Sequence, residues 1–177
     1  MAHTKANIYL IGPMGSGKTT IGRRVSEILE REFFDCDAEL EQATGASVNL
    51  IFDIEGEEGF RERESRVLRE LSLRENSVVA TGGGVVLRPE NRAVMKGSGL
   101  VVYLRTPVAQ QLRRLRLDQT RPLLQTQDRE KRLVELAEKR DPIYESLADI
   151  VFPGQNRSVP VAAQRLSSVI LSYWSDA

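Results

Sequence analysis

Short apolar runs alternate along this chain with longer segments in which apolar residues recur every three or four positions. The short runs are typical of buried strands, and the longer recurrences of helices with one buried face. We expect strands at 7–11, 33–37, 77–81, 100–104 and 149–152. We expect helices over 21–31, 38–44, 48–54, 60–71, 89–95, 107–112, 128–144 and 161–173. Strands that alternate with helices predict an α/β protein whose parallel sheet is covered on both faces.

Glycine, proline and polar residues set the expected boundaries. Gly45 is a typical helix stop, and the segment 55–59 predicts a break between two helices. Pro142 predicts a kink or a helix end near Asp141. The segment 116–127 has no periodicity and reads as a mobile loop. Neither repeats nor a linker divide the 177 residues, so we expect one domain.

Composition narrows the class of protein. Twenty-five basic residues balance twenty-five acidic ones, so no overall field attracts nucleic acid or an anionic membrane. The single Cys36 excludes an internal disulfide and suits a reducing compartment. No apolar run approaches the length of a membrane span, and the first residues lack the apolar centre of a signal peptide. We therefore expect a cytoplasmic protein.

A phosphate-binding motif lies between the first strand and the first helix. The sequence Gly-Pro-Met-Gly-Ser-Gly-Lys-Thr at 12–19 fits the template Gly, four residues, Gly-Lys-Ser/Thr. Its glycines let backbone N–H groups converge on a triphosphate, and the N-terminus of the following helix favours the same anion. Lys18 would reach the outer phosphates, and the Thr19 hydroxyl would join the Mg²⁺ shell. A glycine-rich turn that happens to contain lysine is the plainer alternative, but the flanking strand and helix favour nucleotide binding.

Two carboxylates follow the second expected strand. In parallel sheets ligands bind beyond the carboxyl ends of the strands. Asp35 and Asp37 would point the same way along an extended segment, with Cys36 facing the core. One carboxylate could hold Mg²⁺ through water while the other accepts a hydrogen bond or proton from a substrate hydroxyl. The alternative is that both cap the helix that begins at Ala38.

Three consecutive glycines, Gly82-Gly83-Gly84, follow the third expected strand. A strand-to-helix turn needs one glycine, and each further one costs conformational entropy. The triplet therefore predicts close backbone approach or unusual torsions in a loop that faces a ligand.

Several arginines are candidates for binding an anion. Arg61 lies beside the apolar Phe60, and Glu64, three residues later, could clamp its guanidinium and leave the rest of the fork for an anion. Arg140 stands near an expected helix end. Arg121, in the aperiodic loop, could move onto a transferring phosphate as an arginine finger. Spacing alone decides none of these roles.

The sequence resembles the shikimate kinases, P-loop kinases of the aromatic amino-acid pathway, over nearly its full length. The resemblance rests on six motifs: 12–19, Asp35-Cys36-Asp37, Phe60-Arg61-Glu62-Arg63-Glu64, Thr81-Gly82-Gly83-Gly84, Arg121-Pro122-Leu123-Leu124 and Arg140-Asp141-Pro142-Ile143-Tyr144. Many nucleotide-binding families share the first motif, whereas the set in this order is far more specific. The resemblance implies a three-layer P-loop kinase fold in one domain, 1–177, with a five-stranded parallel sheet in the order 2-3-1-4-5. It also implies a helical substrate-binding region at about 37–64 and a mobile lid at about 114–127.

The implied reaction is ATP- and Mg²⁺-dependent transfer of the γ-phosphoryl group to the 3-hydroxyl of shikimate. The resemblance implies catalytic roles for Lys18, Asp37 and Arg121. It implies ATP contacts from Gly15, Ser16, Gly17, Lys18, Thr19, Thr20, Arg121 and Arg157, with Arg114 at the base of the lid. It implies shikimate contacts from Asp37, Arg61, Gly83 and Arg140, and a metal site at Thr19 with Asp35 in its outer shell. Two arginines for a carboxylate and one aspartate for a hydroxyl suit this acceptor chemically.

Two other functions remain open at this point. One is another small-molecule kinase of similar build, acting on gluconate or a nucleoside monophosphate. The other is a binding module that uses the phosphate loop as a nucleotide switch, although the Asn-Lys-x-Asp element of a guanine-specific switch is absent. For the kinase, we expect a monomer that binds ATP and a small acceptor, without nucleic acid or membrane partners.

Overall fold

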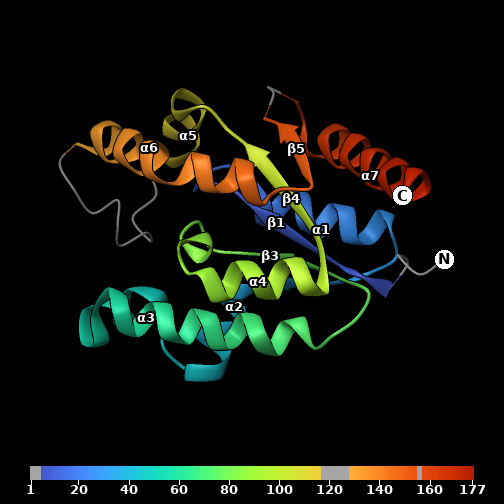
Figure 1. Ribbon diagram of the computed structural model, residues 1–177. Helices are drawn as coiled ribbons and strands as arrows, with labels where there is room; N and C mark the ends of the chain where they lie inside the picture. The colour runs from blue at the N-terminus through green and yellow to red at the C-terminus, as the bar shows by residue number, and fades with distance from the viewer. Residues whose placement is uncertain (1–4, 117–127, 155–156) are drawn as a thin grey trace.

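The computed structural model describes residues 5–116, 128–154 and 157–177. Its centre is a five-stranded parallel sheet in the order β2-β3-β1-β4-β5 (Figure 1). The strands are β1 (Asn7–Ile11), β2 (Glu32–Asp35), β3 (Ser77–Ala80), β4 (Gly99–Arg105) and β5 (Ile150–Pro153). The predicted strand order is confirmed.

Helices cover both faces of this sheet and complete the predicted three layers (Figure 1). The helices are α1 (Lys18–Ile28), α2 (Cys36–Thr44), α3 (Val48–Ser72), α4 (Pro89–Ser98), α5 (Val108–Leu115), α6 (Arg129–Leu147) and α7 (Val159–Asp176), with a short 3₁₀ helix, η2 (Val85–Leu87). Helices α1 and α7 pack on one face, and α3, α4 and α6 on the other. None of the helices in the described ranges is long and apolar enough to cross a membrane.

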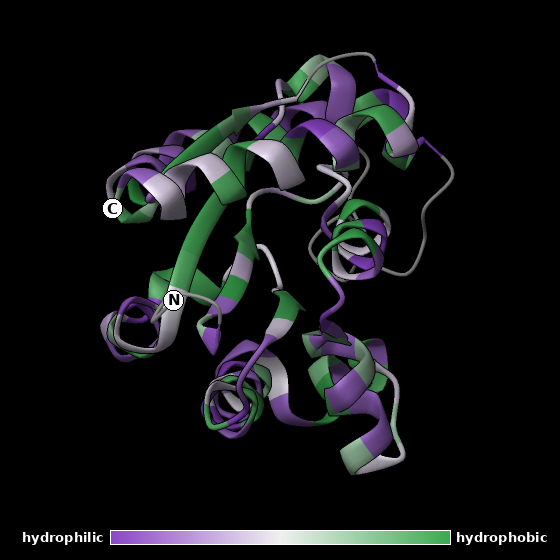
Figure 2. Ribbon diagram, turned by 90° about the vertical axis from the view of Figure 1, so that its right-hand side faces the viewer, coloured by the Kyte–Doolittle hydropathy of each residue, from purple (hydrophilic) through white to green (hydrophobic). Residues whose placement is uncertain are grey.

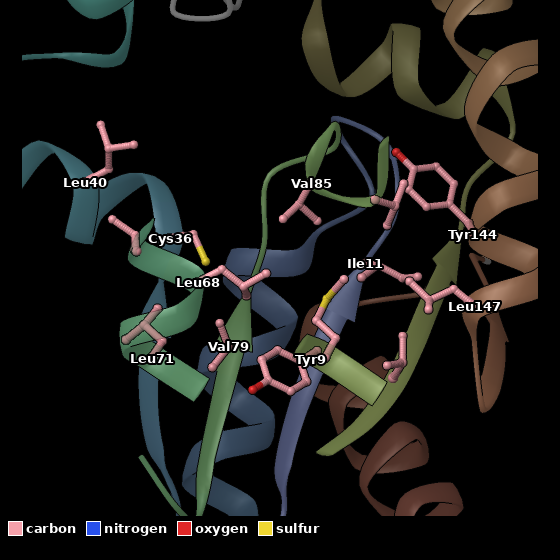
Figure 3. Packing of buried hydrophobic residues seen from close by; sticks show 14 of the residues in the cluster. Tyr9, Ile11, Cys36, Leu40, Leu68, Leu71, Val79, Val85, Tyr144 and Leu147 are labelled. Atoms are coloured by element: carbon pink, nitrogen blue, oxygen red, sulfur yellow. The ribbon is translucent and has the colours of Figure 1, made fainter. Parts of the chain in front are cut away.

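The central strand β1 shows why its sequence is a continuous apolar run. Ile8 and Leu10 pack toward α1 and α7, whereas Tyr9 and Ile11 pack toward the opposite layer, and all four are fully buried. Figure 3 shows Tyr9 and Ile11 among apolar side chains of the sheet and the helices. Hydropathy colouring shows hydrophobic strands between helices of mixed character (Figure 2). A strand buried on both faces has no polar side to alternate with.

The second strand ends earlier than predicted. It stops at Asp35, whose side chain caps α2 by accepting a hydrogen bond from the Ala38 N–H at 3.1 Å. Asp37 therefore lies in the first turn of α2 and not on an extended segment, so the predicted alternation of the two carboxylates is wrong. Aspartate is a favoured N-cap, and this preference decides where the helix begins. Gly45 ends α2 in a left-handed conformation, as predicted.

The two predicted helix breaks have different outcomes. The break predicted at 55–59 is confirmed, because two helical segments meet at a kink at the non-helical Gly56 within α3. Helix α6 continues through Pro142 to Leu147, so the predicted end near Asp141 is wrong. Proline inside a helix costs about 3 kcal/mol, whereas burial of a large side chain contributes about 1.5–3 kcal/mol. Tyr144 and Leu147, both buried beyond Pro142, together offset that cost.

Candidate active site

The phosphate loop occupies residues 12–17, between β1 and α1. Gly12, Gly15 and Gly17 all have positive φ angles, which only glycine adopts without strain. A Cβ atom on Gly12 would also lie 2.8 Å from the Leu104 carbonyl oxygen. Because α1 begins at Lys18, its unpaired first N–H groups face the loop and favour an anion there.

Lys18 and Thr19 place a cation and a hydroxyl at the mouth of this loop. Lys18 Nζ donates hydrogen bonds to the carbonyl oxygens of Gly12, at 2.7 Å, and Pro13, at 2.9 Å. Thr19 Oγ1 donates to Asp35 Oδ2 at 2.6 Å. A hydroxyl beside a carboxylate is a hard oxygen pair that suits Mg²⁺. The described residues contain no cluster of three or more acidic, histidine or cysteine side chains that could hold a metal ion.

A cavity of about 620 Å³ opens above the phosphate loop. This cavity brings together residues that the sequence predicts for binding ATP, the metal or the acceptor. They are Gly15, Gly17, Lys18, Thr19, Thr20, Asp35, Asp37, Gly83 and Arg114. The two carboxylates thus face one cavity, as predicted, although α2 and not an extended strand places Asp37 there.

A small pocket of about 50 Å³ adjoins this cavity. Asp37, Val48, Gly82 and Gly83 line both spaces. The pocket is further lined by Met14, Phe52, Phe60, Arg61, Glu64, Gly84 and Arg140. Arg61, Glu64 and Arg140 are buried, with exposed fractions of 7%, 1% and 5%. Buried charges are rare unless they are paired or bind a ligand, so this cluster is a candidate binding site.

The pairing within this cluster follows the predicted clamp. Arg61 Nη1 donates to Glu64 Oε1 at 3.0 Å, and Arg61 Nη2 donates to Glu57 Oε1 at 3.5 Å. Arg61 Nε and Arg140 Nε have no hydrogen-bond partner within the described residues. The two guanidinium groups therefore keep donors for an anion.

Burial shifts the pKa values of these groups. Desolvation raises the pKa of Glu64, with Arg61 opposing the shift and the nearby Asp37 adding to it. Desolvation lowers the pKa of Arg140, and the positive charge of Arg61 lowers it further. An added anion would relieve the repulsion between the two arginines, so the pocket favours a small carboxylate ligand.

The glycine triplet allows the backbone to approach these charges closely. A Cβ on Gly82 would lie 2.5 Å from Glu64 Oε2, and one on Gly83 would lie 3.3 Å from Arg140 Nη1. A Cβ on Gly84 would overlap the Arg61 guanidinium. None of the three has a positive φ angle, so close approach, and not unusual torsion, explains the triplet.

A third cavity, of about 350 Å³, continues from the other end of the phosphate loop. It shares Gly17, Thr20 and Arg114 with the large cavity, and Arg114 Nη1 donates to the Gly15 carbonyl at 2.8 Å. Its walls include Ser16, Ile21, Leu104, Phe152, Gly154, Arg157, Val159 and Ala162. The mixture of apolar walls and two arginines suits a flat heterocyclic base. The three cavities thus form a continuous series.

Sequence reasoning missed several residues of these walls. Phe152 and Gly154 follow the last strand, the position where ligands are expected, and could have been found by that rule. Val48 and Phe52 also line the small pocket, but their sequence pattern is that of ordinary helix core and does not indicate a ligand. Tyr144 lies behind these walls and was interpreted only as an apolar helix position, although its spacing from Arg140 places both on one helix face. Arg121 lies outside the described residues.

The chain is similar to known proteins over most of its length. The family model described as Shikimate kinase matches residues 14–171. A Shikimate kinase from Legionella pneumophila (strain Corby) is 51% identical over 160 residues, which cover 90% of this chain and 91% of that protein. A Shikimate kinase from Acinetobacter baylyi is 50% identical over 169 residues, with 96% and 94% covered.

Solved structures give the same result for the fold. A structure of Shikimate kinase from Acinetobacter baumannii in complex with shikimate has a TM-score of 0.93 and 48% identity, and the match covers 96% of this chain and 95% of that one. A gluconokinase from Sinorhizobium meliloti has a TM-score of 0.60 at 18% identity, with 96% and 97% covered. The second likeness shows a shared fold alone.

Proposed function

The chain belongs to the shikimate kinase family, and from this premise we propose how its residues divide the work of phosphorylating shikimate with ATP and Mg²⁺. One observation carries the proposal: Asp37 and Gly83 line both the cavity above Lys18 and the pocket that holds Arg61 and Arg140. A phosphoryl donor and a small acidic acceptor can therefore meet end to end. Such positioning is the main contribution of a protein to phosphoryl transfer.

The small pocket binds the acceptor. Arg61 and Arg140 bind the shikimate carboxylate, and Gly83 closes the pocket with its backbone. Glu64 holds Arg61 in place, because its Oε1 accepts a hydrogen bond from Arg61 Nη1 at 3.0 Å. Asp37, at the boundary with the large cavity, accepts a hydrogen bond from the 3-hydroxyl and directs its oxygen toward the γ-phosphate.

The phosphate loop and the third cavity bind ATP. Gly15, Ser16, Gly17 and Thr20 surround the phosphates, and Lys18 reaches the transferring group. Thr19 and Asp35 would hold Mg²⁺, which neutralises charge on the phosphates. Arg157 contacts the base, and Arg121, together with Lys18, stabilises charge that develops during transfer.

An acceptor assay tests the reaction and its specificity. Protein with ATP and Mg²⁺ should release ADP on addition of shikimate, and far less with gluconate, a nucleoside monophosphate or no acceptor. The Asp37→Asn variant should lose about 100-fold in turnover while its affinity for ATP stays within twofold. Turnover of another acceptor in preference to shikimate would refute the assignment, and an unchanged rate for the variant would remove Asp37 from it.

We further propose that the chain works as one cytoplasmic monomeric domain, without nucleic acid or membrane partners. Residues 37–64 form its substrate-binding region and residues 114–127 its lid. The balanced charge supports the lack of polyanionic partners. Light scattering across a hundredfold range of concentration should give the mass of one chain, and a mass that doubles with concentration would contradict the monomer.

A further inference from the structure

We propose that Tyr144 is a positioning residue for the acceptor: its hydroxyl holds the Gly83 carbonyl and the Arg140 guanidinium in the arrangement that receives the shikimate carboxylate. This inference rests on the function proposed above and deepens it. Tyr144 lines neither the large cavity nor the small acceptor pocket. It acts through two residues that line the acceptor pocket.

The contacts of the Tyr144 hydroxyl connect two separate elements. Tyr144 lies on α6 and is fully buried, and its hydroxyl donates to the Gly83 carbonyl oxygen at 2.5 Å. Arg140 lies one helical turn earlier, on the same face, and its guanidinium interacts with the same hydroxyl. A phenol has one proton to donate and lone pairs that accept. It can therefore donate to Gly83 and accept from Arg140 at the same time.

The hydrogen bond to Gly83 fixes more than one atom. A peptide unit is planar, and its C=O and N–H point in opposite directions. Holding the Gly83 carbonyl therefore also fixes the direction of the Gly84 N–H, beside Arg61. A Cβ on Gly83 would lie 3.3 Å from Arg140 Nη1 and 3.6 Å from both Tyr144 Oη and the Gly12 carbonyl oxygen. Tyr144 thus secures the point where the phosphate loop, the glycine triplet and α6 meet.

The ring and the hydroxyl of Tyr144 have separable roles. The ring belongs to the hydrophobic core and packs against Tyr103, with the ring centres 5.0 Å apart. In Figure 3 the hydroxyl points away from that core, toward the loop that follows β3. Replacement by phenylalanine keeps the ring and removes only the oxygen, so Tyr144→Phe isolates the proposed role.

Tyr103 provides a matched control. It is equally buried and belongs to the same aromatic pair, but its hydroxyl bonds to Asp141, and it lines none of the three cavities. Tyr144→Phe should raise the KM for shikimate about tenfold, because a hydrogen bond that orients a charged group is lost. The KM for ATP should stay within twofold. Tyr103→Phe should leave both constants within twofold, even if thermal denaturation shows a similar loss of stability in the two variants.

A double-mutant cycle tests whether Tyr144 acts through Arg140. In an Arg140→Lys background, Tyr144→Phe should raise the KM for shikimate by no more than about threefold, since the planar guanidinium that the hydroxyl orients is already gone. Equal effects in the two backgrounds would overturn the proposal. An unchanged KM for shikimate in Tyr144→Phe, or an equal rise in both KM values, would overturn it as well. Absence of shikimate turnover in the unmodified protein would instead refute the proposed function.

Discussion

The two ends of the active site are built in different ways. The phosphate end comes from one contiguous segment, 12–19, and uses mainly backbone groups and the start of α1. The acceptor end is assembled from α2, α3, the loop after β3 and α6, and uses buried side-chain charges. Backbone donors in a loop need little support from elsewhere, whereas buried charges depend on partners that arrive from distant parts of the chain. The acceptor end is therefore the more sensitive to changes in packing.

The phosphate end should lose the most activity on a single substitution, because Lys18 places a positive charge directly at the phosphate loop. Lys18→Met should reduce turnover about 1,000-fold, while the free energy of unfolding stays within about 1 kcal/mol of the unmodified protein. Single-turnover kinetics and denaturation by urea measure the two quantities. Lys131→Met removes the same charge from an exposed position on α6 and should leave turnover within twofold. A loss of only a few-fold in Lys18→Met would show that backbone groups suffice.

The acceptor end should respond through substrate affinity. Arg61→Lys should raise the KM for shikimate about tenfold, since an ammonium cannot reproduce the two-pronged contact with a carboxylate, and should leave the KM for ATP within twofold. Arg63, two residues away on α3, pairs with Glu55 at 2.6 Å and lines none of the three cavities. Arg63→Lys should therefore change neither constant by more than twofold. Equal effects in the two variants would contradict the carboxylate assignment.

The space that Gly84 leaves for the Arg61 guanidinium can be tested without changing a charge. Gly84→Ala should destabilise the protein by about 1–3 kcal/mol and raise the KM for shikimate about fivefold, because its methyl group would displace the buried Arg61 guanidinium. Gly84 has φ −91° and ψ 1°, which alanine also adopts, so the effect is one of space. Gly97, on α4, has nothing within 4 Å of a built Cβ, and Gly97→Ala should stabilise by about 1 kcal/mol. Urea denaturation measures the stability of both variants, and shikimate titration measures the KM. Destabilisation by Gly97→Ala would contradict the claim that the effect of Gly84→Ala comes from the space at Arg61.

The smallest expected effect is a pH dependence of stability. Burial raises the pKa of Glu64 above its ordinary value, so the folded state holds this proton more tightly than the unfolded chain does. The resulting stabilisation is present below the ordinary pKa and is lost as the pH rises through the folded pKa. Relative to the unmodified protein, Glu64→Gln should therefore gain stability as the pH rises above the ordinary glutamate pKa of about 4.3.

Glu55 is the matched control with the opposite sign. Its hydrogen bond to Arg63 lowers its pKa, so its stabilising contribution is present above the ordinary value and is lost as the pH falls. Glu55→Gln should accordingly lose stability, relative to the unmodified protein, as the pH rises. Denaturation curves from about pH 2 to pH 8 measure both variants, because the change expected for Glu55 lies below the ordinary pKa of glutamate and that for Glu64 lies above it. The same direction of change in the two would contradict the assignment of the buried carboxyl.

The sequence predicts the phosphate end better than the acceptor end for a physical reason. Spacing within 12–19 is a local property, so the loop can be read directly from the chain. Asp37 was expected on an extended segment and lies in a helix, yet it faces the expected cavity because α2 begins at Asp35. Val48 and Phe52 acquire their role only when α3 packs beside the glycine triplet. No local pattern distinguishes such residues from ordinary core.

Pro142 shows the same limit in the fold. Proline usually ends a helix because it removes a backbone hydrogen bond. Helix α6 nevertheless continues, because burial of the turn after Pro142 outweighs the free-energy cost of the proline. That extra turn also carries Tyr144 to the Gly83 carbonyl. The sheet order, in contrast, follows the resemblance to the family, since alternation of strands and helices fixes only that the sheet is parallel.

The glycine triplet sets a rule for changing which acceptor the enzyme takes. Each glycine leaves the space into which one charged side chain extends: Gly82 for Glu64, Gly83 for Arg140 and Gly84 for Arg61. Enlarging one member of a pair requires a smaller partner on the facing helix. Libraries aimed at bulkier or uncharged acceptors should therefore vary these positions as coupled pairs, because single replacements would be eliminated before a useful combination arose.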